Sequence, residues 1–212
     1  IVLAAIAVFL ILRLRGVLGS RDGFEPPAVP EAPPARRMPA DTDIATQDED
    51  DVSDHVEPAS PAARALEAMK RADPSFTVGP FLLGARQAYE MILTAFERGD
   101  LTDVRAFLSP AVAEAFDGAI ESRRARGLTA QVQYLGTRET TLEAASFDPD
   151  SRMGEVSVRF VGELIVSHAD ASGAVVEGDA RTARKQRDVW TFARDTRSRD
   201  PNWKLVATEA ED

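Results

Sequence analysis

The chain has 212 residues, a formal net charge of −10 and no cysteine. Without cysteine it can form neither a disulfide framework nor a thiolate metal site. The acidic excess argues against a nucleic-acid partner, because nucleic-acid surfaces gather lysine and arginine on one face.

Residues 1–19 are predicted to be a membrane anchor. Their twelve-residue apolar run is shorter than the ~20 residues that span a bilayer core, and we expect residues before Ile1 to complete the span. The following arginines favour a cytoplasmic position for the rest of the chain. A cleaved signal peptide and an interfacial helix are the alternatives. The anchor residues are Ile1, Val2, Leu3, Ile6, Val8, Phe9, Leu10, Ile11 and Leu12, and the charges that set topology are Arg13, Arg15 and Arg21.

Residues 20–60 are predicted to be a disordered linker. They hold seven prolines, eleven acids and three arginines, and the stretch from Asp41 to Glu57 has no lysine or arginine. Such a composition buries too little apolar area to offset the entropy of ordering. The alternative is an acidic docking tail for a basic partner. His55 lies among these acids, but no ligand spacing predicts a metal site there.

Residues 61–212 are predicted to form a domain that begins with helices. Residues 61–72 suit a helix capped by Ser60, and residues 80–98 carry an apolar stripe at helical spacing. A shorter helix after Asp100 and a third from Pro110 to Gly127 follow. The basic residues of the first helix suit either a surface helix or contact with anionic headgroups; the candidates for that contact are Arg64, Lys70 and Arg71. The positive charge of Arg123, Arg124 and Arg126 suits the C-terminus of their own helix, and a phosphate or lipid-headgroup contact is the alternative.

Past Gly127 the period of apolar residues changes to two. Strands are expected over 131–142, with a bend near Gly136, and over 155–168, 187–194 and 203–208. Helices followed by a run of strands predict an α+β fold with helices on one face of an antiparallel sheet. Trp190 and Phe192 share one side of the third strand.

Two groups of residues in the predicted domain form a recognisable pattern. In the helical half they are Phe81-Leu82, Gly84-Ala85, Tyr89, Ile92, Ala95-Phe96 and Gly99-Asp100-Leu101. In the second half they are Val158-Arg159-Phe160, Gly173, Val176, Gly178, Asp179, the run Asp188-Val189-Trp190-Thr191-Phe192, and Asp200-Pro201-Asn202-Trp203. This pattern resembles the mitochondrial inner-membrane translocase subunit 44 family, and its bacterial TimA-type members most of all. The similarity covers roughly residues 73–210, and its tryptophan segments are the most specific part.

The resemblance implies a nuclear-transport-factor-2-like cone, with three to four helices on a curved four-stranded antiparallel sheet around an apolar pocket. It also implies a scaffold at the inner membrane that binds cardiolipin and a protein partner of the translocation or assembly machinery. The chaperone-recruiting N-terminal region of the mitochondrial relatives has no counterpart here. The resemblance therefore favours a general single-pass adaptor of the bacterial inner membrane with a cytoplasmic head.

Few residues suggest catalysis. His168 closes a strand and is expected at the surface, and phosphate-loop, nucleophile-elbow and paired-histidine motifs are absent. Asp188 is the candidate carboxylate for an enzyme of this fold, and pairing with a nearby arginine such as Arg159 is its structural alternative. Candidates for lining the pocket are Tyr89, Phe160, Trp190 and Trp203. We expect a non-enzymatic adaptor without cofactor or metal; a small-molecule carrier or enzyme, or a periplasmic domain, are the competing hypotheses.

Overall fold

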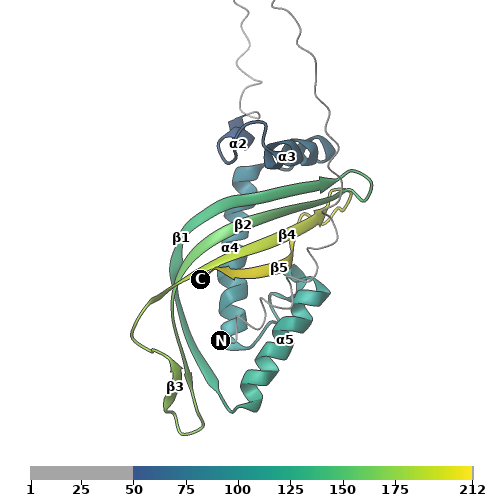
Figure 1. The fold of residues 1–212 in the computed structure, drawn as a ribbon. Coiled ribbons are helices and arrows are strands. Elements are labelled where there is room, and N and C mark those ends of the chain that lie inside the picture. The colour runs from purple at the N-terminus through teal and green to yellow at the C-terminus, as the bar shows by residue number, and fades with distance from the viewer. Residues whose placement is uncertain (1–49, 212) are drawn as a thin grey trace, which may run out of the picture.

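The computed structural model describes residues 50–211, which form an α+β domain with helices packed on one antiparallel sheet (Figure 1). This confirms the predicted fold class, and the layering is consistent with the cone that the resemblance implies. The helical elements are α2 (Asp50–Ser53), α3 (Pro61–Ala72), α4 (Val78–Arg98), the 3-10 helix η2 (Arg105–Phe107) and α5 (Pro110–Ala125). The strands are β1 (Thr129–Asp148), β2 (Met153–Ala169), β3 (Val175–Gly178), β4 (Arg184–Asp195) and β5 (Lys204–Glu211).

Serine–proline pairs start two of the helices. At α3 the Ser60 hydroxyl accepts a hydrogen bond from the Ala63 amide at 3.1 Å, and proline follows the cap. At α5 the Ser109 hydroxyl accepts one from the Val112 amide at 3.3 Å, again before proline. Each cap satisfies an amide that has no partner inside its helix. Both helices therefore begin where the sequence predicts.

The predicted helix after Asp100 is wrong. The Asp100 carboxylate accepts hydrogen bonds from the amide and the hydroxyl of Thr102, at 3.0 and 2.7 Å, and so stabilises a turn. Only the three residues of η2 are helical before Leu108 bridges to Leu205 of β5. The preceding helix, α4, starts two residues earlier than predicted and ends at Gly99, whose φ of 77° is a left-handed conformation that suits glycine.

The sheet has the order β1-β2-β4-β5, and all neighbours are antiparallel. The predicted strands are present but longer, and β1 continues six residues beyond its expected end. Three register shifts interrupt the pairing of β1 with β2, and one of them confirms the predicted bend near Gly136. The residues of β1 that have no partner across the ladder are Leu135, Arg138 and Glu143.

The sheet has five strands rather than the four that were predicted. The short strand β3 pairs with the end of β2, where His168 lies opposite Glu177. Gly178 ends this strand with a φ of 77°, and a Cβ there would lie 2.3 Å from the Val166 carbonyl oxygen. Four residues are too few to give a recognisable period of two, which is why β3 escapes prediction. Together with the long ends of β1 and β2 it forms an arm below the main sheet (Figure 1).

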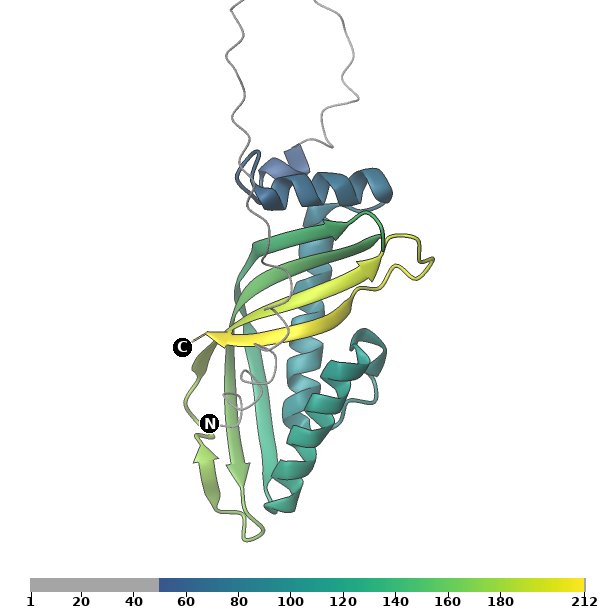
Figure 2. The ribbon, with the colours of Figure 1, turned by 45° about the vertical axis from the view of Figure 1, so that its right-hand side comes forward.

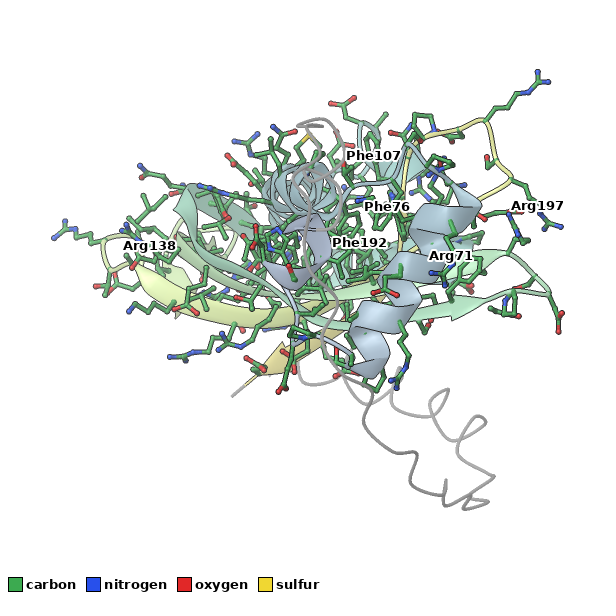
Figure 3. All side chains as sticks on the ribbon, turned by 90° about the horizontal axis from the view of Figure 1, so that it is seen from above. Arg71, Phe76, Phe107, Arg138, Phe192 and Arg197 are labelled. Carbon is green, nitrogen blue, oxygen red and sulfur yellow. The ribbon has the colours of Figure 1, made fainter. Side chains whose placement is uncertain are left out.

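One continuous apolar core joins α3, α4 and α5 to the inner face of the sheet. The long helix α4 runs behind the strands, while α3 lies across one end of them (Figure 2). Viewed from above, Phe76 and Phe192 lie toward the interior, whereas Arg138 and Arg197 project outward at opposite ends (Figure 3). The aromatic stripe of α4 and the period-two residues of β2 and β4 meet in this core.

The predicted linker and anchor lie largely outside the described residues, which begin at Asp50. The end of that linker, expected to be disordered, instead forms α2 and a turn in which the His55 and Val56 amides both donate to the Val52 carbonyl oxygen at 3.2 Å. Val52 is buried and Val56 packs against the core, which supplies the apolar contact that the composition did not predict. Within residues 50–211, no helix has the length and apolar character needed to cross a bilayer.

Candidate functional site

Three aromatic rings fill the space between α4 and the inner face of the sheet. Tyr89 stacks on Phe160 with ring centroids 4.4 Å apart, and Trp190 meets the Tyr89 ring edge-on at 4.7 Å. All three side chains are at most 3% exposed. Offset and edge-on rings gain stability beyond their buried area. These candidates for pocket lining therefore make the contacts of a packed core.

A carboxylate lies buried beside these rings. The Tyr89 hydroxyl donates a hydrogen bond of 2.6 Å to Asp188 Oδ2, and Gln186 Nε2 donates to the same oxygen at 3.0 Å. Asp188 is 4% exposed, and burial raises its pKa despite these two hydrogen bonds. Burial, and then the nearby Asp188, raise the pKa of the Tyr89 hydroxyl. Tyr89 therefore acts here as a donor.

The backbone of β2 leaves room for that hydroxyl. Gly162 faces the ring of Tyr89, and a Cβ at this position would lie 3.0 Å from the Tyr89 oxygen and 3.1 Å from its Cε1. Such distances are shorter than ordinary van der Waals contact. Glycine at this point of β2 thus positions the hydroxyl against Asp188.

Asp188 does not pair with Arg159, so that prediction is wrong. In the register of β2 with β4, Asp188 lies opposite Phe160 on the inner face, and Arg159 points to the other face. There Arg159 pairs with Glu139 at 3.1 Å and with Glu211 at 2.7 Å. Neighbouring strand residues face opposite sides of a sheet, which explains the error.

A second buried carboxylate, Glu97, lies near the end of α4. Its side chain is 4% exposed and pairs with Arg123 of α5 at 3.2 Å. His168 Nε2 lies 3.7 Å from the same Glu97 oxygen, and Arg184 of β4 approaches the other oxygen at 3.7 Å. This residue therefore joins three cationic or titratable side chains from α5, β2 and β4. His168, expected at the surface, is only 12% exposed because α4 and α5 cover it.

Arg123 and Arg124 lie in the last turn of α5, as predicted, and they also interact with the C-terminus of α4. Arg123 Nη2 donates to the Phe96 carbonyl oxygen at 2.6 Å, and Arg124 Nη2 donates to that of Gly99 at 2.5 Å. Arg123 also lies over the Phe96 ring, 5.4 Å from its centroid. Carbonyls at a helix C-terminus have no partner inside the helix and carry partial negative charge. Their position in the last turn of α5 confirms the prediction, and the sequence did not indicate the additional hydrogen bonds to the end of α4.

Arg184 links the two buried carboxylates: it contacts Glu97 directly and reaches Asp188 through the side chain of Gln186. Its Nη2 lies 3.4 Å from Gln186 Oε1 and 3.7 Å from Glu97 Oε1. The result is a polar network that runs from Tyr89 in the core to Glu177 and Arg126 at the arm. In residues 50–211 the buried polar residues are Glu97, Ser167, Gln186 and Asp188. Three of these four belong to the network, which makes it the candidate functional site.

Sequence reasoning missed Glu97, Gln186 and Arg184. Glu97 lies beside the apolar stripe of α4, so its spacing does not distinguish it from a solvated residue. Gln186 alternates with Asp188 and Trp190 along β4, and a strand predicted to start at residue 186 would have placed it inward.

The basic residues of α3 form a separate surface feature. Arg64 donates to the Ala59 carbonyl oxygen at 2.8 Å, and Arg71 lies 3.8 Å from Glu67 with both side chains exposed. Arg71 and Arg152 border a hollow of about 390 Å³ at the end of α3, together with Phe147. Two guanidinium groups beside an aromatic ring give this hollow a cationic, partly apolar character.

The remaining predicted residues do not join the polar network. Trp203 is half-buried and contacts Phe76 and Phe81, at centroid distances of 5.6 and 4.8 Å. His55 follows α2, and residues 50–211 hold no cluster of three or more metal-ligating side chains. The predicted anchor, from Ile1 to Leu12, and the topology arginines lie outside the described residues.

Comparison with known proteins gives one family. Residues 62–210 match the family model of the Tim44-like domain, a range that includes every residue of the polar network. No curated protein sequence matches significantly. One similar solved structure is that of the intermembrane space region of the chloroplast protein ARC6, at 12% identity and a TM-score of 0.36, covering 59% of this chain and 95% of that chain.

Proposed function

This chain belongs to the Tim44-like domain family, and on that premise we propose that it is a non-enzymatic adaptor that holds a protein partner at a membrane. The family match over residues 62–210 is the observation that carries the proposal. The family is generally non-catalytic. The TimA-type role, with an N-terminal anchor in the bacterial inner membrane and a cytoplasmic head, is the specific form that we propose.

The filled interior supports an adaptor. Tyr89, Phe160 and Trp190 fill the space between α4 and the sheet, and their contacts are those of a close-packed core. A scaffold needs such a rigid body, because its partners are recognised on the outside. The network around Glu97 adds rigidity by joining the ends of α4 and α5 to β2 and β4.

The surface of α3 supports contact with anionic lipid. Arg64 and Arg71 are exposed on this helix, and Arg71 borders the cationic hollow with Arg152. Each basic residue near an anionic membrane contributes about 1 kcal/mol of attraction, and salt weakens it. A head tethered by residues 1–19 would need only this modest contribution to rest against the bilayer.

Two measurements test the adaptor role. Full-length protein extracted in mild detergent should co-purify with a defined protein partner under conditions in which the tether alone, residues 1–60, does not. Residues 50–212, which contain the continuous core, should float with cardiolipin vesicles at low salt and should not float with neutral phosphatidylcholine vesicles.

Charge reversal supplies the matched control for lipid contact. Arg64→Glu with Arg71→Glu should abolish flotation, whereas Arg181→Glu with Arg187→Glu, an equal change of charge elsewhere, should preserve it. Absence of flotation for the unmodified protein at low salt would refute lipid contact by the head. A full-length protein that captures no partner above the tether control would refute the adaptor.

One observation favours the alternative, a small-molecule carrier or enzyme. A carboxyl group with a raised pKa beside a tyrosine hydroxyl is a pair that acid–base chemistry uses. Its activity would need the aromatic rings to move aside for a ligand. A metabolite that co-purifies with the protein and is lost on Asp188→Asn would support this function over the adaptor.

A further inference from the structure

His168 lies where four elements of the molecule meet. It ends the long part of β2, opposite Ala130 of β1 and Glu177 of β3, and the ends of α4 and α5 cover its ring. The arm formed by β3 and the ends of β1 and β2 contains this residue, because its partners Ala130 and Glu177 belong to the other two strands of the arm. Any change in the charge of this ring therefore acts on the junction between the arm and the helices.

The two ring nitrogens have different surroundings. Nε2 lies 3.5 Å from Arg123 Nη1, an arrangement in which a neutral ring accepts and the guanidinium donates. Nδ1 is buried without a hydrogen-bond partner, and its nearest carboxylate is Glu177 at 4.0 Å. A buried polar atom without a partner is rare and costs stability. The junction is thus built around a neutral ring that is only partly satisfied.

The charged groups that face this ring come from every element packed against it. Glu97 of α4 and Glu177 of β3 are the anions; Arg123 of α5 and Arg184 of β4 are the cations nearest Glu97. Arg126, which follows the last residue of α5, lies 3.5 Å from Glu177 and adds a third cation. A proton on His168 would make four cations around two carboxylates. It would also turn Nε2 from an acceptor for Arg123 into a donor that faces it.

We propose that His168 is a pH-sensitive latch, whose protonation releases the β3 arm from the ends of α4 and α5. The neutral ring holds Arg123 in place, and Arg123 in turn holds Glu97 and the Phe96 carbonyl oxygen. Protonation breaks the first of these contacts and repels the cations around it. The arm then keeps only its backbone pairing and the exposed Arg126–Glu177 pair as contacts that do not involve His168 or Arg123.

The direction of the pKa agrees with this geometry. Burial lowers the pKa of His168 below its usual value near 6.5; Glu97 opposes that effect and Arg123 adds to it. The unfolded chain therefore binds the proton more readily than the folded chain. Stabilisation by the neutral ring is complete above about pH 6.5 and is lost as the pH falls through the lower pKa of the folded state.

Release of the arm would change an apolar surface. Val175 and Val176 of β3 are 50% and 54% exposed, and two adjacent valines of a strand point to opposite faces. Loosening β3 from β2 would expose more of both. The latch thus couples acidification to a surface that a partner could recognise, and this inference holds whether or not the adaptor function does.

Hydrogen exchange of the full-length protein in mild detergent tests the latch. Peptides covering residues 170–185 should lose protection several-fold between about pH 7.5 and pH 5, after correction for the intrinsic pH dependence of exchange. His168→Gln, which cannot titrate, should show no such change, and His55→Gln should behave like the unmodified protein. Because the chain has two histidines, the same pair of variants assigns both ring resonances in an NMR titration.

The Glu177 variant gives an independent readout. Since Glu177 raises the pKa of His168, Glu177→Gln should shift the midpoint of the His168 resonance and the loss of protection together to lower pH. Unchanged protection in the unmodified protein across this range would overturn the latch. Equal loss of protection in His168→Gln, with far-ultraviolet circular dichroism unchanged, would assign the effect to another group and overturn it as well.

Discussion

The two carboxylates of the polar network are equally buried but are satisfied in different ways. Asp188 receives hydrogen bonds from the neutral donors Tyr89 and Gln186, and no lysine or arginine of residues 50–211 pairs with it. Glu97 faces Arg123, Arg184 and His168. The comparison shows that two equally buried carboxylates can be satisfied by different kinds of partner. At Asp188 the hydrogen bonds from neutral donors do not cancel the effect of desolvation, which raises the pKa of this carboxyl group. At Glu97 the carboxylate belongs to a cluster of charged side chains.

The difference also affects what each carboxylate connects. Asp188 joins α4 to β4 inside the apolar core through Tyr89, near the middle of the sheet. Glu97 joins α4 to α5, β2 and β4 through Arg123, His168 and Arg184. Removing one is expected to weaken a packed core, and removing the other to release several buried charges. The following predictions test this distinction, from the largest expected effect to the smallest.

Glu97→Gln should have the largest effect, because it leaves Arg123 buried without its anion while keeping the size of the side chain. Breaking a buried ion pair from one side costs about 3–5 kcal/mol. Urea denaturation measures the loss of unfolding free energy. The matched control is Glu90→Gln on the exposed face of α4, where a change within about 0.5 kcal/mol is expected. Equal effects at residues 90 and 97 would contradict the ion-cluster role.

Tyr89→Phe should cost less, because it removes one hydrogen bond to Asp188 and keeps the ring stacked on Phe160. A buried acceptor that loses a donor costs about 1–3 kcal/mol. Denaturation together with a crystal structure of the variant would separate the lost hydrogen bond from any movement of the ring. If the variant is as stable as the original protein, the Tyr89 hydroxyl does not stabilise Asp188.

Gly162→Ala tests whether the space that Gly162 leaves for the Tyr89 hydroxyl is needed, and it changes neither Tyr89 nor Asp188. The added methyl would lie 3.0 Å from that oxygen, and overpacking of this kind costs about 1–3 kcal/mol. Gly118→Ala is the opposite control, since nothing lies within 4 Å of its Cβ position in α5. There alanine should raise stability by about 0.5–1 kcal/mol through helix propensity. Thermal unfolding of the two variants should therefore shift in opposite directions.

Asp188→Asn should change how the free energy of unfolding depends on pH, more than it changes that free energy at any one pH. Because the folded-state pKa of Asp188 is raised, its stabilising contribution is complete below the unfolded pKa near 4 and is lost as the pH rises through the folded value. The variant lacks this loss. The difference in unfolding free energy between variant and original protein should therefore move in favour of the variant from about pH 4 to pH 7. A difference that stays constant would show that Asp188 does not titrate in this range.

Much of the fold could be predicted because local rules agree with the tertiary packing. Serine–proline caps start α3 and α5, and the stripe from Phe81 to Phe96 gives α4 its buried face. The segment after Asp100 failed because apolar spacing suggests a helix, while the aspartate side chain stabilises a turn. β3 is too short to have a period. Apolar spacing predicts a helix correctly only where no side chain forms hydrogen bonds with the backbone amides that the helix would need.

The candidate site was predictable only in part, for a different reason. Tyr89, Asp188 and Trp190 are spaced so that they share the buried face of their helix or strand with its apolar residues, and their burial follows from that spacing. Glu97 is buried and His168 is mostly covered because helices and strands distant in sequence pack against them. No single-sequence pattern encodes that cover. The partner of Asp188 was missed because register, not proximity in sequence, decides which residues of β2 and β4 face each other.

The interrupted pairing of β1 has a consequence for solubility. A twenty-residue strand at the end of a sheet presents a long row of amides and carbonyls that another chain could use as a template for cross-β growth. The residues left over at the three register shifts, Leu135, Arg138 and Glu143, break that row into short segments and twist it. Two of them are charged. A strand pairing with β1 would therefore meet irregularly spaced backbone amides and carbonyls and would also have to remove water from charged side chains. The irregularities of this strand therefore protect the protein against aggregation at high local concentration.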